Sequence, residues 1–257
     1  MEIDIEKVNE IALEAGEAIM NIYFLKDKEV SLKSDESPLT KADLLSQKII
    51  SSSLKKIYPS IPIISEESKQ TDYEERKQWE YFWLVDPLDG TKEFIKGNGE
   101  FTVNIALIEK NSPVLGVVFI PALNLLYFAS KWIKGSFKRA QGSEDLKLKV
   151  NSDKKTDLIA VKSRSHSSSS EEEFFSKLPV SSVIQAGSSL KFCLIAEGVA
   201  DIYLRSGHTY EWDTAAGQAI LEKAGGYVYS MGESLKYNKA TMLNESFVAS
   251  ANLSYLK

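Results

Sequence analysis

Cysteine and histidine are scarce in this chain. Its 257 residues include one cysteine, Cys193, and two histidines, His166 and His208. A single cysteine excludes an intramolecular disulfide and fits a reducing compartment, so we expect a cytoplasmic protein. A zinc site built from histidine and cysteine is poorly supplied. Any bound metal is therefore expected to have oxygen ligands, which favours Mg²⁺, Mn²⁺ or Ca²⁺.

Long apolar runs and an excess of positive charge are also missing. No stretch reaches membrane-spanning length, and the first residues, M-E-I-D-I-E, are too acidic and polar for a signal peptide. The formal net charge of −5 argues against non-specific binding of nucleic acid. The chain is 43% hydrophobic and 26% charged, which is typical of a globular protein with a substantial core. We therefore expect no integral membrane segment and no nucleic-acid partner.

The first half of the chain has two kinds of apolar pattern. Helical spacing predicts helices over residues 3–26 and 40–58. Apolar runs predict a meander of strands at 61–64, 81–85, 101–108, 114–120 and 125–129. The charged segment 68–80 is expected to be a mobile surface excursion. Residues 1–155 are therefore expected to form an α+β lobe with an antiparallel sheet.

The second half alternates between strands and helices. Strands are expected at 158–161, 183–185, 200–205, 227–230 and 247–250. Helices are expected at 171–178, at 212–224 and after 187–189, where the helix ends at 197. This alternation predicts an α/β lobe over 156–257 with its site residues at strand ends.

One stretch, W-L-V-D-P-L-D-G-T-K-E-F at 83–94, carries the clearest chemistry. A buried strand is expected to end at Asp86, where Pro87 stiffens the turn and Gly90 permits unusual backbone angles. Asp89 follows on that turn, and a helix start with free N–H groups, able to hold an anion, comes next. D-P-x-D-G is also ordinary turn chemistry. Carboxylates for a hard cation beside donors for a phosphate favour metal-assisted phosphate chemistry.

Two more carboxylates stand at the ends of expected elements. Glu66 follows a strand and could simply begin a loop, and Asp213 begins a helix and could simply be its N-cap. The joint hypothesis is that Glu66, Asp86, Asp89 and Asp213 converge on two or three Mg²⁺ ions. Such a cluster would repel itself without cations, so metal binding should also stabilise the fold.

Asp43 and Thr91 form a candidate proton relay. Thr40 and Asp43 match the T-x-x-D capping box before an apolar run, which gives Asp43 an ordinary structural explanation. The two explanations are compatible, because a carboxylate at a helix start can also face a site. Thr91 could then pass a proton from an attacking water to Asp43.

Several motifs together resemble those of a known family. The glutamates after I-I-S at 63–65, the 83–94 stretch and E-W-D-T-A-A-G at 211–217 resemble the lithium-sensitive inositol monophosphatase superfamily over nearly the whole chain. Four further segments are similar to its 3′(2′),5′-bisphosphate nucleotidase branch, the CysQ type: P-L-T-K-A-D (38–43), S-R-S-H (163–166), G-S-S-L-K-F-C (187–193) and A-D-I-Y-L-R (200–205). The resemblance implies an α+β fold, a layered α-β-α-β-α sandwich.

The resemblance also implies a role for each matching residue. The Mg²⁺ ligands would be Glu66, Asp86, the backbone carbonyl of Leu88, Asp89 and Asp213. Asp43 and Thr91 would activate the attacking water. Gly90 and Thr91 would bind the scissile phosphate, and Glu66, Leu88, Asp89 and Asp213 would contact the substrate as well. The nucleotide side would be lined by His166, Ser188, Lys191 and Arg205.

The nucleotide-side residues also have ordinary explanations. Lys191 could lie on a solvated helix face, Arg205 could belong to a surface ion pair and His166 could sit in a polar loop. His208, in S-G-H-T-Y, has no assigned role.

The implied reaction is Mg²⁺-dependent hydrolysis of the 3′-phosphate of 3′-phosphoadenosine 5′-phosphate, giving AMP and phosphate. The sulfated form, 3′-phosphoadenylyl sulfate, is a second candidate substrate, and the setting would be sulfur assimilation or nucleotide recycling. Water would attack in line without a phosphoenzyme, and lithium would inhibit. The protein would act as a monomer or homodimer, and peripheral association with the inner face of the membrane stays open.

Three alternatives remain. One is another superfamily activity, on inositol phosphates or fructose 1,6-bisphosphate. A second is a haloacid-dehalogenase-type phosphatase, whose D-x-D-G-T motif looks similar but has one residue between its aspartates rather than two. The third is a non-catalytic module that senses metal or nucleotide.

Overall fold

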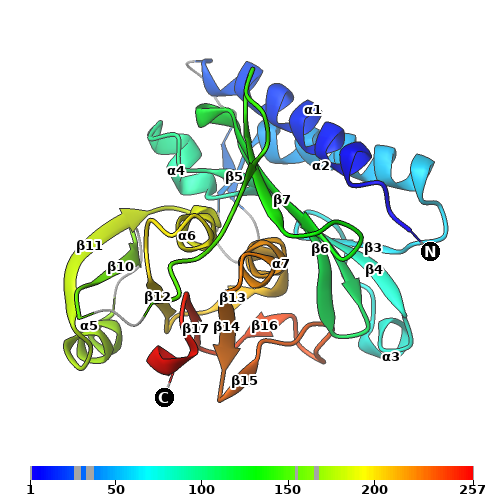
Figure 1. Cartoon of the computed structure of the whole chain (residues 1–257). Coiled ribbons are helices and arrows are strands. Elements are labelled where there is room, and N and C mark those ends of the chain that lie inside the picture. The colour runs from blue at the N-terminus through cyan, green and yellow to red at the C-terminus, as the bar shows by residue number, and fades with distance from the viewer. Residues whose placement is uncertain (1, 26–29, 33–37, 154–155, 165–167, 257) are drawn as a thin grey trace.

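The computed structural model describes residues 2–25, 30–32, 38–153, 156–164 and 168–256, and helices and sheets alternate in layers through it (Figure 1). The outermost layer contains α1 (Ile5–Tyr23) and α2 (Lys41–Ile57). The predicted capping box begins α2: the N–H of Thr40 donates to Asp43 Oδ2 at 2.8 Å, and its hydroxyl donates to the same oxygen at 2.5 Å. A two-stranded ribbon, β1 (Ser31–Leu32) with β2 (Pro38–Leu39), lies between these helices in the chain.

The second layer is a seven-stranded sheet in the order β3-β4-β5-β6-β7-β8-β9. Its strands are β3 (Ile63–Ser65), β4 (Tyr81–Asp89), β5 (Thr102–Glu109), β6 (Ser112–Ile120), β7 (Leu125–Ser130), β8 (Ser136–Ala140) and β9 (Leu146–Lys147). The 3-10 turn η1 (Pro121–Leu123) joins β6 to β7. The strands from β4 to β9 pair antiparallel, which confirms the predicted meander, whereas β3 and β4 pair parallel.

The segment between β3 and β4 lies mostly at the surface, as predicted, but the short helix within it was not predicted. It contains α3 (Tyr73–Arg76), and Arg76 is only 3% exposed. The guanidinium of Arg76 donates to Asn238 Oδ1 at 2.8 Å and to the carbonyl oxygen of Ala240 at 3.0 Å. The anchoring of this arginine could not be predicted, because its acceptors lie 162 and 164 residues away in the sequence.

The third layer contains α6 (Leu190–Ala196) and α7 (Ala215–Lys223). The helix predicted over 212–224 is therefore split, because a 3-10 turn, η2 (Glu211–Asp213), precedes α7. The fourth layer is a six-stranded sheet: β11 (Val180–Ala186), β10 (Leu158–Ser163), β12 (Ile202–Arg205), β17 (Phe247–Ser250), β14 (Tyr227–Ser230) and β15 (Glu233–Ser234). Its first three strands are parallel and the rest antiparallel, so the sheet is mixed.

The fifth layer contains α5 (Ser169–Ser176) and η3 (Leu253–Leu256). The predicted α-β-α-β-α sandwich is thus confirmed. The division into lobes at 155/156 remains our proposal, since α7 contacts both β6 of one sheet and β14 of the other. None of the helices in the described ranges is long and apolar enough to cross a membrane.

The alternation of side chains along β4 determines which layer of the fold Asp86 faces. Trp83 and Val85 belong to the core under α1 and α2, whereas Phe82 and Leu84 belong to the core shared with α6 and α7. Successive side chains on a strand point to opposite faces. Asp86 therefore continues the face of β4 that is turned toward η2 and α7.

Candidate active site

Asp86 was predicted to end the strand, but β4 continues to Asp89 with a register shift between the two aspartates, and Asp86 is only 1% exposed. Its Oδ1 accepts the N–H of Leu88 at 3.0 Å, so the turn explanation is correct as far as it goes. Burial raises the pKa of Asp86 well above its ordinary value, and the charges of Glu66, Asp89 and Asp213 raise it further. The charges of four carboxylates, drawn from three separate segments of the chain, therefore influence one another's ionisation at this site.

Asp89 is held by side chains that the motif did not indicate. Its Oδ2 lies 3.1 Å from the hydroxyl of Ser189 and 3.3 Å from the amide nitrogen of Asn104. Burial raises the pKa of Asp89, and the charge of Lys191 and these two hydrogen bonds oppose the rise. Asn104 is a buried polar residue within the apolar run V-N-I-A-L, so a signal for it was present in the sequence. For Ser189 the only signal in the sequence was the doubled serine of G-S-S.

Asp213 is the last residue of η2. Its Oδ2 accepts the N–H of Tyr210, the N-cap of η2, at 2.8 Å. The N-cap of α7 is Thr214, so the N-cap explanation for Asp213 is wrong. Its backbone carbonyl accepts the Ser189 hydroxyl at 2.8 Å, which places Ser189 between Asp213 and Asp89. Burial raises the pKa of Asp213 well above its ordinary value, and the charges of Asp89 and Glu66 add to this.

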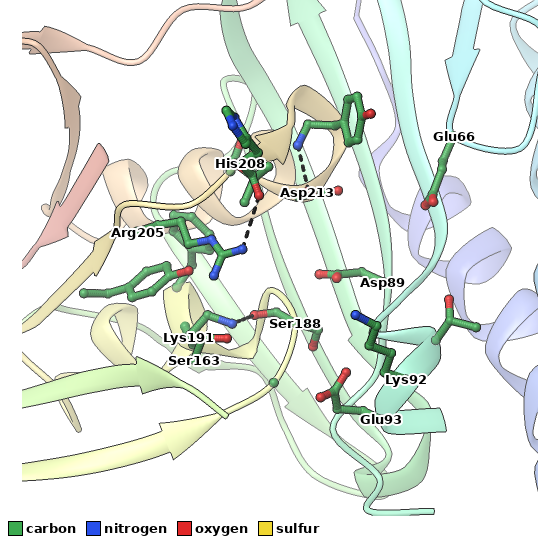
Figure 2. Close-up of a pocket in the computed structure, with 18 of the residues that line it drawn as sticks. Glu66, Asp89, Lys92, Glu93, Ser163, Ser188, Lys191, Arg205, His208 and Asp213 are labelled. Atoms are coloured by element: carbon green, nitrogen blue, oxygen red, sulfur yellow. Dashed lines mark hydrogen bonds between the residues drawn. The ribbon is translucent and has the colours of Figure 1, made fainter. Parts of the chain in front are cut away.

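The carboxylates surround a common space without forming a finished coordination sphere. Figure 2 shows Glu66, which follows β3, on the opposite side of this space from Asp213, with Asp89 between them. Within the described ranges, no three His, Cys, Asp or Glu side chains are already assembled as a metal site. An all-oxygen, buried and mutually repelling set fits a hard cation such as Mg²⁺.

Asp43 and Thr91 lie in contact. Asp43 Oδ2 serves the capping box, and Oδ1 lies 3.1 Å from the Thr91 hydroxyl, so one carboxylate serves both purposes. Thr91 begins α4 (Thr91–Lys96), and its hydroxyl also lies 3.4 Å from the carbonyl oxygen of Leu88. Gly90 precedes the helix at φ 88°, a left-handed conformation that side chains disfavour.

A pocket of about 410 Å³ opens beside these groups. Its acidic side contains Glu66, Asp89 and Asp213. Gly90 and Thr91 also line the pocket. Its other side is lined by Ser163, Ser188, Lys191, Tyr203, Arg205 and His208 (Figure 2). Asp86 and Leu88 lie beneath this surface, each 1% exposed.

Lys191 is buried in the pocket wall, so the prediction of a solvated helix face is wrong. Its ammonium donates to the carbonyl oxygen of Ser188 at 2.6 Å and lies 5.3 Å from the centre of the Tyr203 ring. Burial lowers its pKa to about 8, although the charge of Asp89 opposes this change. This side of the pocket therefore contains a buried cation that contacts a carbonyl oxygen and an aromatic ring.

Two more polar groups on this side are buried without hydrogen-bond partners among the described residues: Arg205 Nε and Ser188 Oγ. Arg205 donates from Nη2 to the carbonyl oxygen of His208 at 3.2 Å. Ser188 has a φ of 44°, which is strained for a residue with a side chain. His208 is exposed at the pocket, and His166 lies outside the described residues.

Comparisons with known proteins agree with this geometry. The chain matches the model of the inositol monophosphatase family over residues 3–256. The 3′(2′),5′-bisphosphate nucleotidase CysQ of Salmonella typhimurium is 44% identical over 246 residues, covering 95% of this chain and 98% of that protein. CysQ of Buchnera aphidicola is 44% identical over 255 residues, covering 96% and 93%.

Solved structures give the same result. The crystal structure of CysQ from Bacteroides thetaiotaomicron has a TM-score of 0.83 at 40% identity and covers 96% of each chain. An inositol monophosphatase from Thermotoga maritima has a TM-score of 0.78 at 23% identity, covering 96% and 91%, and shows the fold alone. This chain belongs to the inositol monophosphatase family, whose members are metal-dependent phosphatases.

Proposed function

We propose that the protein is a Mg²⁺-dependent phosphomonoesterase that releases the 3′-phosphate of 3′-phosphoadenosine 5′-phosphate. The observation that carries this proposal is a pocket with carboxylates at one side and Lys191 and Arg205 at the other. A substrate with two phosphate groups matches both sides. The relatives named 3′(2′),5′-bisphosphate nucleotidase support the same substrate.

The acidic side would hold two or three Mg²⁺ ions through Glu66, Asp86, the Leu88 carbonyl, Asp89 and Asp213. When bound, the ions would neutralise charge on the phosphate and on the leaving oxygen. The raised pKa values of Asp86 and Asp213 support this assignment, because these carboxylates are unfavourable as anions without a cation.

The remaining residues divide the chemistry among them. Thr91 would accept a proton from the attacking water and pass its own hydroxyl proton to Asp43 Oδ1, 3.1 Å away. As the water oxygen bonds to phosphorus, the bond to the 3′ oxygen breaks with its electron pair, that oxygen takes a proton from a solvent water, and the nucleotide leaves as AMP. Gly90 and Thr91 would contact the scissile phosphate. Lys191 and Arg205, with Ser188 and His166, would bind the nucleotide and its second phosphate.

A phosphate-release panel tests the proposal. With Mg²⁺ present, we expect the highest kcat/KM on 3′-phosphoadenosine 5′-phosphate, activity on its sulfated form, and weaker activity on inositol 1-phosphate and fructose 1,6-bisphosphate. Arg205→Ala should reduce turnover of the bisphosphate nucleotide far more than that of inositol 1-phosphate. A preference for inositol 1-phosphate would contradict the substrate assignment.

Two further outcomes would contradict the mechanism. An acid-stable phosphoenzyme after rapid quenching would indicate an aspartyl nucleophile instead of water. Tight binding of the nucleotide with no release of phosphate would indicate a sensing module. A cytoplasmic location, a monomeric or homodimeric state and inhibition by lithium remain predictions.

A further inference from the structure

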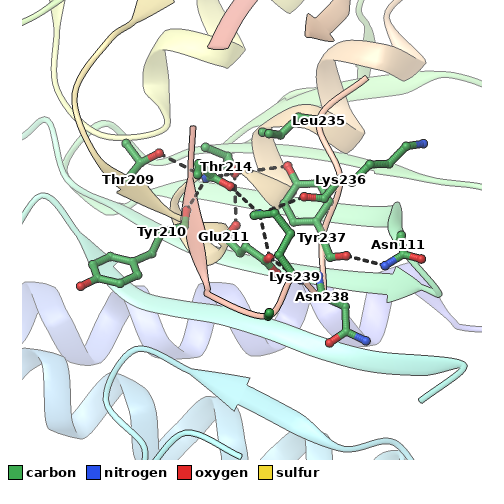
Figure 3. A network of polar contacts seen from close by, with 12 residues as sticks. Asn111, Thr209, Tyr210, Glu211, Thr214, Leu235, Lys236, Tyr237, Asn238 and Lys239 are labelled. Atoms are coloured by element: carbon green, nitrogen blue, oxygen red, sulfur yellow. Dashed lines mark hydrogen bonds and ion pairs between the residues drawn. The ribbon is translucent and has the colours of Figure 1, made fainter. Parts of the chain in front are cut away.

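Glu211 is a fully buried carboxylate that the proposed chemistry does not use. It lies two residues before Asp213 and has 0% of its surface exposed. Its carboxylate accepts the N–H groups of Asn238 at 2.8 Å and of Lys239 at 3.0 Å (Figure 3). The ammonium of Lys239 donates to the same carboxylate at 2.7 Å. The buried negative charge is therefore balanced by a lysine 28 residues later in the chain.

The Lys239 ammonium has no donor to spare. Besides Glu211, it donates to the carbonyl oxygen of Lys236 and to Asn244 Oδ1, both at 3.0 Å. An ammonium has three N–H donors, so these acceptors use all of them. Because the amide oxygen of Asn244 faces the ammonium, its amide nitrogen must face the other way. The lysine thus sets the orientation of the Asn244 side chain.

Tyr210 connects this network to the candidate metal site. Its carbonyl oxygen accepts the Asn244 amide nitrogen at 2.8 Å, and its own N–H donates to Asp213 Oδ2 at 2.8 Å. Thr214, on the other side of Asp213, lies 3.1 Å from the same amide nitrogen and 3.2 Å from the Tyr237 hydroxyl. Both flanks of Asp213 are therefore bound by this network.

The loop that carries Lys239 is anchored from behind. Arg76 donates to the side chain of Asn238 and to the carbonyl of Ala240, and Asn238 Nδ2 donates back to the carbonyl oxygen of Arg76 at 2.8 Å. Arg76 and Asn238 are both buried. Arg76, from the segment between β3 and β4 of the first sheet, therefore helps to fix the position of Lys239, in addition to the contact with Glu211.

We infer that the Lys239–Glu211 pair is a positioning device for Asp213, an inference that rests on the proposed metal-binding role of Asp213. A buried ion pair contributes little net stability compared with packed apolar side chains. Groups that orient a metal ligand, in contrast, change metal affinity by about 10- to 100-fold when they are removed. The contacts that run from the pair through Asn244 and Tyr210 to Asp213 give it this second role.

Lys239→Met tests the inference by direct titration with Mn²⁺, monitored by electron paramagnetic resonance without substrate. We expect the Mn²⁺ dissociation constant to rise about tenfold, with kcat at saturating Mg²⁺ close to that of the unmodified protein. Lys239→Arg, which keeps the charge, should recover part of the affinity. Glu211→Gln removes the other charge and should weaken Mn²⁺ binding similarly, which gives an answer if Lys239→Met does not fold.

Lys138→Met is the matched control. The Lys138 ammonium lies 2.8 Å from Glu197 with 22% of its side chain exposed, compared with 2.7 Å and 29% for Lys239. Lys138 does not line the pocket, so its variant should bind Mn²⁺ normally. Equal Mn²⁺ affinity in the two methionine variants would overturn the inference, and so would a loss in both that follows a lowered melting temperature. An unmodified protein that binds no Mn²⁺ would instead overturn the proposed metal site itself.

Discussion

Lys191 makes the nucleotide side of the pocket sensitive to pH. Burial lowers its pKa to about 8, so the side chain is charged below that pH and neutral above it. A neutral amine no longer attracts a phosphate. Since kcat/KM reports ionisations of the free enzyme, we expect kcat/KM for the bisphosphate nucleotide to fall as the pH rises through about 8.

Two comparisons check the origin of this fall. Lys191→Met should have a lower kcat/KM at pH 7 and lack the alkaline fall. The monophosphate 3′-AMP, which has no second phosphate, should show a weaker alkaline fall with the unmodified protein. If kcat/KM of Lys191→Met still falls at alkaline pH as it does in the unmodified protein, another group is responsible for the ionisation.

Thr91 offers a test of the proton relay by removal of one oxygen atom. Thr91→Val keeps the branched shape but removes the hydroxyl that lies 3.1 Å from Asp43. We expect kcat to fall by about 100-fold or more, as for loss of a positioned acid–base group, while Mg²⁺ affinity stays nearly constant. Thr91→Ser should restore most of the activity. Phosphate-release kinetics measure both variants, and a loss of only a few-fold in Thr91→Val would remove Thr91 from the relay.

Sequence reasoning found the candidate residues that lie inside compact motifs at the ends of elements. Asp43, Glu66, Asp86, Asp89 and Asp213 could be named in this way. The charges of Glu66, Asp89 and Asp213 raise the pKa of Asp86, and Asp43 contacts Thr91. Supporting residues were missed where the contact spans a long stretch of chain. Ser189, for example, meets Asp89 across 100 residues, and no local pattern contains that contact.

At the scale of elements, α7 approaches β6 most closely at Gly116. A Cβ added there would lie 2.3 Å from the carbonyl oxygen of Ala216 and 2.8 Å from the Cβ of Ala219. Neither atom can rotate away. Gly116→Ala should therefore displace α7 together with η2, and we expect the free energy of unfolding in urea to fall by about 1–3 kcal/mol.

Gly16→Ala in α1 is the control for this prediction. Its added Cβ would meet the ring of Phe119, at 2.2 Å from Cε1, and a side chain can shift more readily than a backbone carbonyl. The Gly116 variant should also bind Mn²⁺ more weakly, whereas the Gly16 variant should not. Equal Mn²⁺ affinity in both variants would show that the position of α7 does not affect the metal site.

Periodicity predicted the elements well where an element packs through one apolar face. The helix at α1 is of this kind, whereas the continuous apolar run at 81–85 predicted β4, which is buried on both faces. Periodicity failed where distant polar contacts override the local pattern. The charged segment around Arg76 contains a helix because acceptors in the 238–240 loop bind that arginine. The 212–224 helix is interrupted before Ala215, where Glu211 is bound by Asn238 and Lys239.

For the whole molecule, the crowded carboxylates predict a fold that depends on its cation. The pKa values of Asp86 and Asp213 are raised in the folded state, so the folded protein binds protons at these carboxylates more tightly than the unfolded chain does. The metal-free protein should therefore lose stability as the pH rises through the raised pKa values and these protons are released. Mg²⁺ at a hundred times its dissociation constant should add about 2.7 kcal/mol. For a chain of this size we expect the melting temperature to rise by roughly 5–10 °C.

Differential scanning calorimetry with and without a chelator measures this effect. Asp86→Asn provides the control, because it removes one of the repelling charges and one proposed ligand. Its metal-free form should melt above that of the unmodified protein and gain little from Mg²⁺. A chelator that leaves the melting temperature of the unmodified protein unchanged would contradict the prediction.

The layered architecture could be predicted because the resemblance covers nearly the whole chain, and the helices and meander of the first half fit it. The mixture of parallel and antiparallel strands in the six-stranded sheet could not be predicted. Alternating strands and helices predicted an α/β lobe but not the directions of its strands, and β17 pairs antiparallel with both β12 and β14.

The position of α7 between the two sheets also orders events during protein synthesis. A ribosome completes the whole meander, with Asp86 and Asp89 at the end of its second strand, long before it translates Asp213. Until then the inner face of the meander, with Phe82, Leu84 and Val118, lacks its cover. A nascent chain at that stage exposes an apolar face next to carboxylates that still lack Asp213, and exposed apolar surface of this kind favours aggregation.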